Sequence, residues 1–266
     1  IVHPKIKEYM ARFLRQHDAI NDRQLRTTVK LLGTLLGRVI KTHAGKGVYN
    51  AVEKLRKGFI GLRENENSVK HDQLIRYIGK LDRNTLTDVI RSYSKYFALV
   101  NVTEEAFQHI NRERRLKSGY DSWDGSFDST LREFIGQKIN GKDLQELLGH
   151  LKYIPVFTAH PTEAKRRSEM HLMRRIFSMI LEFQEYKGQS IKKEELLEKL
   201  ESEILILWKT DEVRLKKPTV IDEVENGLYY FRTSLFKAIP QIYGDLEKAI
   251  SRTYQNDPTK NNIEVP

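Results

Sequence analysis

The 266-residue chain contains no cysteine, which excludes disulfide bonds and metal sites built on thiolates. It also lacks any apolar run near the ~20 residues that a membrane-spanning helix needs. Its first residues, IVHPKIKEYM, do not include the apolar core of a secretory signal peptide. Internal repeats and low-complexity tracts are absent too. These absences predict a cytoplasmic protein without a membrane partner.

Composition and charge narrow the class of protein further. Hydrophobic residues make up 39% of the chain, charged residues 31%, and the net charge is +10. The apolar fraction suits a folded protein, and the length suits one large domain or two small ones. The positive charge indicates a basic surface that faces an acidic partner or the rest of a larger assembly. Nucleic acids and phosphates are further candidates, which charge alone does not separate.

Apolar residues recur three or four positions apart through most of the chain, which predicts a mainly α-helical fold. Asp82 or Asn84 is expected to cap the longest helix. Asp222 is expected to cap the last helix, in which Pro240 is a candidate for a kink. The predicted helices span residues 25–40, 48–59, 74–78, 84–110, 127–134, 144–151, 163–186, 192–208 and 222–242.

One segment, Ile154 to Thr158, has the short apolar run of a buried strand. A strand requires partners for its backbone hydrogen bonds, and the rest of the sequence predicts helices. The segment therefore indicates that this polypeptide is part of something longer.

The run VFTAHPTEAKRRS, residues 156–168, is the strongest candidate for a functional site. It predicts a strand that delivers His160 to a strand–helix junction, where α/β enzymes place their chemistry. An imidazole there could act as a general acid or base, or as an electrostatic stabiliser. The simpler interpretation is a partly buried histidine that only hydrogen-bonds to the backbone.

Two adjacent arginines, Arg166 and Arg167, follow the histidine. Neighbouring helical residues point about 100° apart, and guanidinium groups bind phosphate with two hydrogen bonds. An ordinary charged helix surface is the alternative. The next doublet, Arg174 and Arg175, could extend a basic stripe of the kind that nucleic-acid binders show. Aromatic residues do not interleave with these arginines, which argues against a nucleic-acid partner.

In the stretch from Leu207 to Leu228, four carboxylates stand close to the turn at Pro218: Asp211 and Glu212 before it, and Asp222 and Glu223 after it. They favour helix starts through the helix dipole, so a helix hairpin explains the pattern. A divalent ion could in principle bind there, but nothing in the sequence demands one. No pair of histidines has convincing metal-ligand spacing, so we predict no metal site in this chain.

Together these motifs resemble the phosphoenolpyruvate carboxylases. The first signature of that family is a strand ending in TAHPT, then a short gap and two arginines, and it stands here as VFTAHPTEAKRRS. A later acidic and arginine-bearing segment with a proline-led turn is similar to TDEVRLKKPTVIDEVENGLYYF. The stretches LRTTVKLLGTLLGRVI and YFALVNVTEEAFQHINRERR look like the N-terminal helices of the family. The resemblance covers nearly the whole chain.

The resemblance implies an architecture. Family members are several times longer, helix-rich and built around an eight-stranded barrel. Residues 154–158 would be the first barrel strand. We therefore expect residues 1–153 to form an N-terminal helical region. Residues 154–266 would hold the first strand and long helices of an incomplete barrel domain.

The resemblance also implies a reaction in the complete protein: phosphoenolpyruvate and bicarbonate give oxaloacetate and phosphate with Mg²⁺ or Mn²⁺. The metal ligands and the glycine-rich catalytic loop would lie outside this chain. His160 matches the catalytic histidine, which handles the proton of a carboxyphosphate intermediate. Arg166, Arg167 and Arg214 match arginines that line a sugar-phosphate activator site in plant members.

The complete protein is expected to be a homotetramer, and the isolated chain to be inactive without the remaining C-terminal part. Two other functions stay open from the sequence. The chain could be an independent basic helical module that binds polyanions, or a regulatory or scaffold fragment derived from the family.

Overall fold

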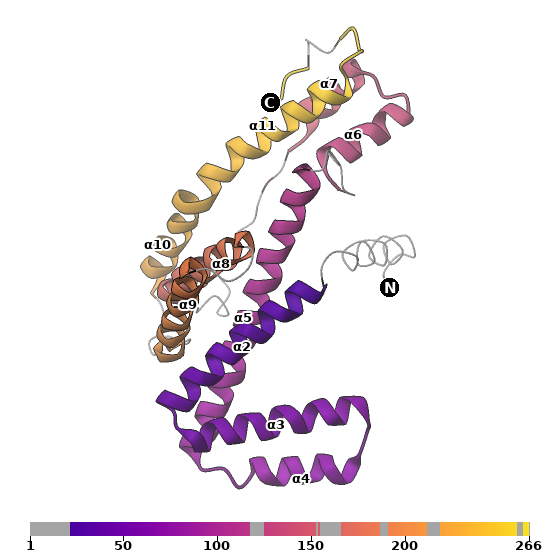
Figure 1. Ribbon diagram of the computed structural model, residues 1–266. Helices are drawn as coiled ribbons and strands as arrows, with labels where there is room; N and C mark the ends of the chain where they lie inside the picture. Colours follow the sequence, from indigo (N-terminus) through magenta and orange to yellow (C-terminus); the bar gives the residue numbers. More distant parts are fainter. Residues whose placement is uncertain are drawn as a thin grey trace. The chain divides into compact units, whose positions relative to one another are not determined.

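The computed structural model describes residues 22–117, 125–152, 154, 166–186, 191–211, 219–259 and 263–265. Within these ranges the chain folds into helices and contains no strand (Figure 1), which confirms the mainly α fold class. The elements are α2 (Asp22–His43), α3 (Lys46–Glu64), α4 (Ser68–Ile78), α5 (Arg83–Lys117), α6 (Phe127–Gly136), α7 (Gly141–His150), α8 (Arg167–Glu185), α9 (Ile191–Lys209), α10 (Val220–Tyr230), the π-helical turn η2 (Phe231–Leu235) and α11 (Phe236–Thr253).

The chain divides into two compact units. The first unit comprises residues 15–112 and 164–213, and the second comprises residues 1–14, 113–163 and 214–266. Ile154 lies outside any helix or strand, and the rest of the predicted strand lies outside the described residues. The predicted division at residue 153 therefore stays a prediction.

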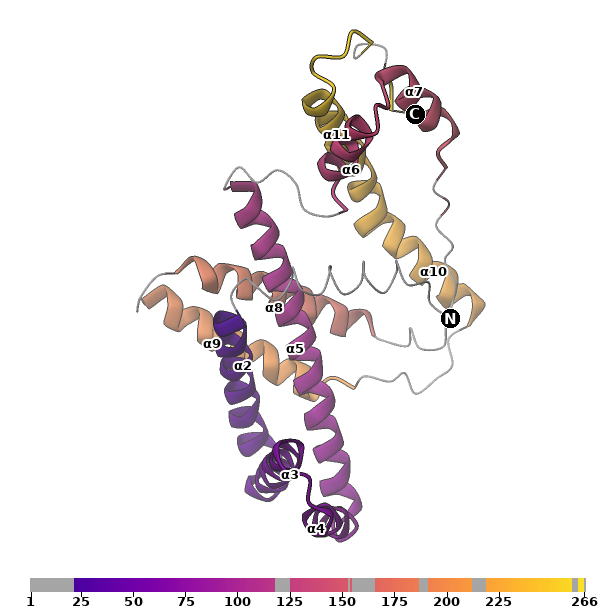
Figure 2. The ribbon, with the colours of Figure 1, turned by 90° about the vertical axis from the view of Figure 1, so that its right-hand side faces the viewer.

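The first unit is built around a core between α2, α5, α8 and α9. In Figures 1 and 2, α8 lies alongside α9, which in turn contacts α2. Each helix contributes apolar residues three or four positions apart, so that one face of each is buried. The fully or nearly fully buried apolar residues on the last two helices are Leu172, Ile176, Ile180, Leu196, Leu200, Ile204, Leu207 and Trp208. The inward face predicted for α9 is thereby confirmed.

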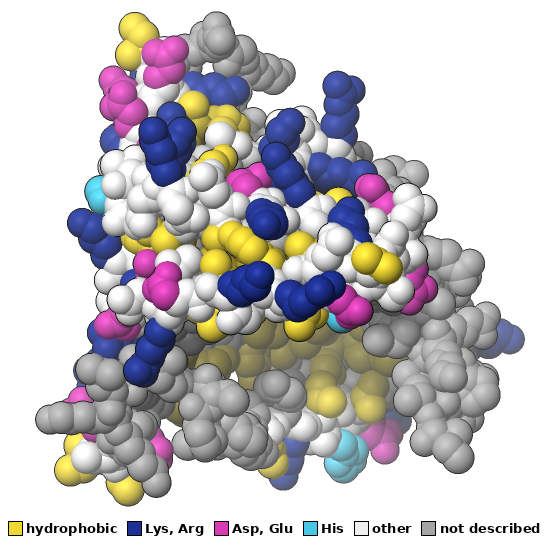
Figure 3. Space-filling model, turned by 90° about the horizontal axis from the view of Figure 1, so that it is seen from below, with side chains coloured by type: hydrophobic (Ala, Val, Ile, Leu, Met, Phe, Trp, Pro, Cys, Tyr) yellow, Lys and Arg dark blue, Asp and Glu magenta, His cyan; other side chains and the backbone are white. Residues whose placement is uncertain are grey.

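Helices α3 and α4 form a hairpin against the first turns of α5. Asn67 caps α4 by accepting a hydrogen bond from the Lys70 backbone N–H at 2.9 Å. Gly58 allows the two helices to approach, since a Cβ at this position would lie 2.6 Å from Leu74 Cδ2. Figure 3 views the molecule from the end where this hairpin lies in Figure 1. On this face, apolar side chains (yellow) lie among lysines and arginines (dark blue). The hairpin therefore keeps an amphipathic outer surface.

The second unit has its own small core, where α11 packs on α6. Its buried residues come from three helices and the turn after α11: Leu131, Leu144, Leu148, Ala249, Ile250 and Tyr254. Arg252 adds a two-pronged ion pair, donating from Nε and Nη2 to the carboxylate of Asp128 at 2.9 and 2.8 Å. Helix α11 is thus anchored at its C-terminal half.

The start of α7 is held by three acidic or amide side chains. Asn140 accepts hydrogen bonds from the backbone N–H groups of Lys142 and Asp143, and Asp143 accepts one from Asn140 in return. Asp257, beyond α11, accepts a further hydrogen bond from the Gly141 N–H at 2.9 Å. A carboxylate at this end of a helix is favoured by the helix dipole. Asp257 therefore ties the C-terminal segment to α7.

Acid should weaken this tie. Hydrogen bonds from the Thr259 hydroxyl, the Thr259 N–H and the Gly141 N–H lower the pKa of Asp257 below its ordinary value. A carboxyl whose pKa is lower in the folded state stabilises the fold above its unfolded pKa of about 3.9, and this contribution is lost as the pH falls through the folded value. We expect the unfolding temperature of the wild type to drop more steeply below about pH 4 than that of Asp257→Asn. Parallel curves from thermal unfolding at several pH values would contradict this account.

Helices α10 and α11 run on from each other through η2. Thr219 is the N-cap of α10, and Asp222 is the third helical residue, which accepts from the Thr219 N–H in a capping box. The prediction that Asp222 itself is the cap was therefore wrong. Pro240 lies inside α11 without ending it. A proline ring crowds the carbonyl four residues earlier, here that of Phe236, and the π turn η2 ends one residue before it, at Leu235.

One face of this long helix is uncovered. At the C-terminal end of α11 the apolar side chains are buried against α6, but toward α10 they are exposed. The exposed side chains are Val220, Ile221, Val224, Leu228, Phe231, Phe236, Ile239, Ile242 and Tyr243. We call these residues the α10–α11 apolar face. A contiguous apolar face of this length is typical of an interaction surface.

Candidate functional site

The structure describes two of the four predicted site residues. Arg166 is the N-cap of α8 and Arg167 its first residue, and both are half-buried. The Arg166 carbonyl accepts hydrogen bonds from the N–H groups of Glu169 and Met170 at 2.9 and 3.2 Å, which close the first turn. His160 and Arg214 lie outside the described residues. Their predicted roles stay predictions.

The first turn of α8 carries a buried charge pair with α5. The ammonium Nζ of Lys95 lies 3.4 Å from Glu169 Oε1, and the two side chains are only 0% and 4% exposed. Both residues continue the buried faces of their helices, since Lys95 precedes Leu99 by one turn and Glu169 precedes Leu172 by three positions. Ionised side chains are seldom buried to this degree unless they are paired. The pair therefore connects the start of α8 to α5 through the edge of the core.

Glu169 does not cap its own helix. As the third helical residue it is in the position from which a glutamate commonly reaches back to the N-cap N–H. Its carboxylate instead points to Lys95. Within the part of the chain that the structure describes, the second carboxylate oxygen, Oε2, is buried and accepts no hydrogen bond. Glu169 therefore contacts α5 instead of the N-cap backbone of its own helix.

One turn before Lys95, Arg91 makes an ion pair and a cation–π contact with the end of α9. Its guanidinium Nη2 lies 3.3 Å from Asp211 Oδ1, and its Cζ lies 5.8 Å from the centre of the Trp208 ring. Residues four apart on a helix share a face. One turn of α5 thus contacts both the start of α8 and the end of α9.

This turn of α5 brings together the flanks of the two segments that the sequence singled out. Glu169 follows Arg166 by three positions, and Asp211 precedes Arg214 by three positions. The sequence pattern contains no reason for these two segments to be neighbours. The contacts of Arg91 and Lys95 supply that reason, because they join the described ends of both segments to one helix face.

Sequence reasoning missed Arg91, Lys95 and Glu169. A signal was present, because Lys95 stands four residues before Leu99 and seven before Val102, on the spacing of a buried helix face. The apolar residues that predicted this helix included Ile90 and Phe97, which are 62% and 59% exposed. The helix was predicted, but its buried side was not identified.

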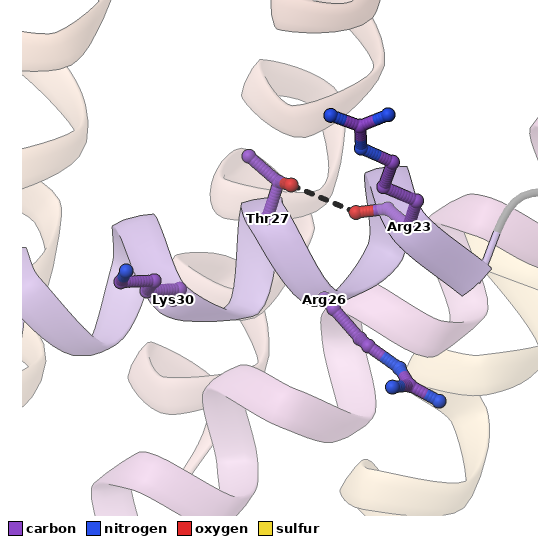
Figure 4. A pocket seen from close by; sticks show the side chains of 4 residues that line it. All are labelled: Arg23, Arg26, Thr27 and Lys30. Carbon is purple, nitrogen blue, oxygen red and sulfur yellow. Dashed lines mark hydrogen bonds between the residues drawn. The ribbon is translucent and has the colours of Figure 1, made fainter.

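A recess near the start of α2 is a weaker candidate. Arg23, Arg26, Thr27 and Lys30 line a space of about 310 Å³. Figure 4 shows the guanidinium groups of Arg23 and Arg26 pointing away from each other, and the Thr27 hydroxyl donating to the Arg23 carbonyl at 2.7 Å. Anion binding needs donors that converge on one point. We therefore do not assign a ligand to this recess.

The described residues lack two further features. No group of three or more histidine, aspartate or glutamate side chains there could hold a metal ion. None of the described helices is both long and apolar enough to cross a membrane.

Comparisons with known proteins identify relatives along the whole described chain. A sequence model for phosphoenolpyruvate carboxylase matches residues 25–265. The phosphoenolpyruvate carboxylase of Roseiflexus castenholzii is 35% identical over 243 residues, which is 90% of this chain and 25% of that protein. The one of Rhodothermus marinus is 35% identical over 88% of this chain and 25% of its own length, and that of Mycobacterium leprae is 29% identical over 85% and 24%. This chain thus spans about a quarter of the length of these curated relatives.

Proposed function

The chain belongs to the phosphoenolpyruvate carboxylase family, and we propose that the complete protein carboxylates phosphoenolpyruvate with bicarbonate to give oxaloacetate and phosphate. The observation that carries this proposal is the match over residues 25–265, which includes the TAHPT segment and both arginines after it. Because the chain spans about a quarter of its relatives, we propose that it is inactive alone and needs the remaining part of the enzyme.

The proposed reaction has two stages. The phosphoryl group leaves the enol oxygen of phosphoenolpyruvate and bonds to a bicarbonate oxygen, which leaves the pyruvate enolate and carboxyphosphate. Carboxyphosphate then loses its C–O bond to phosphate and releases CO₂, and the enolate carbon forms a new C–C bond with that CO₂. His160 takes up the proton of carboxyphosphate as phosphate departs. A positioned donor sheltered from water stabilises such anionic species.

A divalent ion belongs to this proposal but not to this chain. Mg²⁺ or Mn²⁺ would stabilise the charge on the transferring phosphoryl group and on the enolate. The described residues contain no cluster suited to hold such an ion. We propose, from the family resemblance alone, that its ligands lie in the remaining part of the enzyme, and we derive no step through the metal.

We also propose that Arg166, Arg167 and Arg214 bind an anionic activator of the sugar-phosphate class. Guanidinium groups recognise phosphate with paired hydrogen bonds. Arg166 and Arg167 stand next to each other at the start of α8, and the proposal that Arg214 joins them comes from the family resemblance alone.

Replacing Arg166 by alanine tests the activator site. We expect the concentration of glucose 6-phosphate that half-activates the complete enzyme to rise about 10- to 100-fold, because a hydrogen bond to a charged group contributes about 1.5–3 kcal/mol. Steady-state rates measured over a range of glucose 6-phosphate concentrations give this value. Arg174→Ala, on the exposed side of the same helix, serves as the control and should leave the value unchanged. Identical activation of wild type and Arg166→Ala would discard the site.

The exposed α10–α11 apolar face is a surface on which another part of the complete protein could pack. The relatives are about four times as long as this chain, so most of the polypeptide that could cover this face lies outside the sequence described. We propose that the remaining C-terminal part packs on it, and that the complete protein assembles as a homotetramer.

The function itself is tested with the complete protein. Oxaloacetate formation that depends on both phosphoenolpyruvate and bicarbonate supports the proposal, and its absence in a folded complete protein contradicts it. A polyanion-binding module would behave differently, since the isolated chain would then bind DNA with an affinity that falls steeply with salt. Titrating the isolated chain with duplex DNA at two salt concentrations separates the two functions.

A further inference from the structure

We infer that Lys95 and Glu169 are positioning residues, which fix the first turn of α8 against α5 and so set the place of Arg166 and Arg167. The inference adds two residues to the proposed activator site, and its consequence for activation depends on that proposal. The geometry that carries it is the 3.4 Å contact between Lys95 Nζ and Glu169 Oε1, with both side chains almost fully buried.

Stability alone does not account for this pair. Removing two ions from water costs more than an imperfect contact returns, and a well-packed apolar pair of similar size is often equally or more stabilising. The contact here is imperfect: the distance of 3.4 Å is long for a charge-assisted hydrogen bond. The Oε2 atom of Glu169 accepts no hydrogen bond from any described residue. The pair is thus expected to stabilise the contact between α5 and α8 no more than an apolar pair would.

A directional contact fixes the register of a helix, which the neighbouring apolar contacts do not. Farther along, α8 is held by Leu172, Ile176 and Ile180, whose packing is non-directional. Such a helix can shift or rotate slightly at its free end. A buried ion pair has one favourable register, and fixing register is the best-attested use of buried polar groups. In this chain that register is set three residues after Arg166.

A nearby exposed pair offers a matched comparison. Arg38 and Glu201 join α2 to α9 in the same unit at 2.9 Å, with side chains 58% and 34% exposed. Exposed pairs contribute little to stability, and neither residue lies beside the arginines. Replacing both by apolar residues changes the same kinds of charge without touching the start of α8.

The decisive variant is the double replacement Lys95→Met/Glu169→Leu in the complete enzyme. We expect it to unfold at or above the wild-type temperature, whereas each single variant unfolds at a lower temperature: Lys95→Met takes the ammonium away from the buried Glu169 carboxylate, and Glu169→Leu removes the carboxylate that the buried ammonium contacts. The stable double variant should nevertheless need about tenfold more glucose 6-phosphate for half-activation, because the arginines are no longer held in place. Arg38→Met/Glu201→Leu should behave as wild type.

Amide hydrogen exchange of the peptide that covers the first turn of α8 separates positioning from activation. We expect faster exchange in Lys95→Met/Glu169→Leu than in the wild type and the Arg38→Met/Glu201→Leu control. Wild-type exchange together with wild-type half-activation in the Lys95→Met/Glu169→Leu variant would overturn the inference. If glucose 6-phosphate fails to activate even the wild type, the activator site is lost, and exchange alone decides: faster exchange supports positioning and unchanged exchange overturns it.

Discussion

Replacing His160 by asparagine is expected to lower the rate of oxaloacetate formation by the complete enzyme about 10²–10⁴-fold, the range typical of a lost general acid or base. Asparagine keeps a polar side chain of similar reach but cannot exchange a proton near neutral pH. If His160 handles the proton of carboxyphosphate, the carboxylation step loses its acid–base group while the fold remains intact. Steady-state oxaloacetate formation and thermal unfolding, measured side by side, distinguish lost chemistry from lost structure.

The control for this substitution is His150→Asn. His150 is an exposed residue in the last turn of α7, so the same chemical change there should leave the rate unaltered. Phosphate release in the same reaction shows which stage fails, because the first stage moves the phosphoryl group and the second forms oxaloacetate. A His160→Asn enzyme that carboxylates at the wild-type rate would show that the site assignment is wrong.

The sequence predicted the helices well because their ends are determined locally. Asp82 was one of two candidates for the start of the longest helix, and it accepts hydrogen bonds from the N–H groups of Asn84 and Thr85 at 3.0 Å. At α10 the same reasoning chose Asp222, although Thr219 three positions earlier is the cap. Two capping residues three apart form a capping box, so the earlier one should have been preferred.

The charged contacts on α5 were beyond sequence reasoning for a different reason. A lone lysine in an amphipathic helix is ordinarily solvated, and the partner of Lys95 is separated from it by 74 positions. Only packing shows that the two side chains share the interior. The catalytic proposal comes from the TAHPT motif and the family match. The structure contributes only the contacts of Arg91 with Asp211 and of Lys95 with Glu169.

The apolar pattern also predicted more burial than this chain alone supplies. Leu228 and Ile239 have the spacing of a buried face, yet they are 49% and 46% exposed. Periodicity marks which side of a helix is apolar, but it does not say what covers that side. For α9 the pattern and the packing agree, which makes this helix the best place to measure what burial contributes.

Truncating Ile204 to alanine is expected to lower the free energy of unfolding by about 2–5 kcal/mol, because a cavity remains where the side chain packed. Ile204 is 0% exposed and belongs to the core that α8, α9, α2 and α5 share. Ile206→Ala is the matched control: Ile206 lies on the same helix and is 47% exposed, so the same substitution should change stability by about 0.5 kcal/mol or less. Both substitutions alter helix propensity equally, so their difference isolates burial. Urea unfolding followed by circular dichroism gives both values, and equal losses would mean that α9 does not turn its Ile204 face toward α8 and α2.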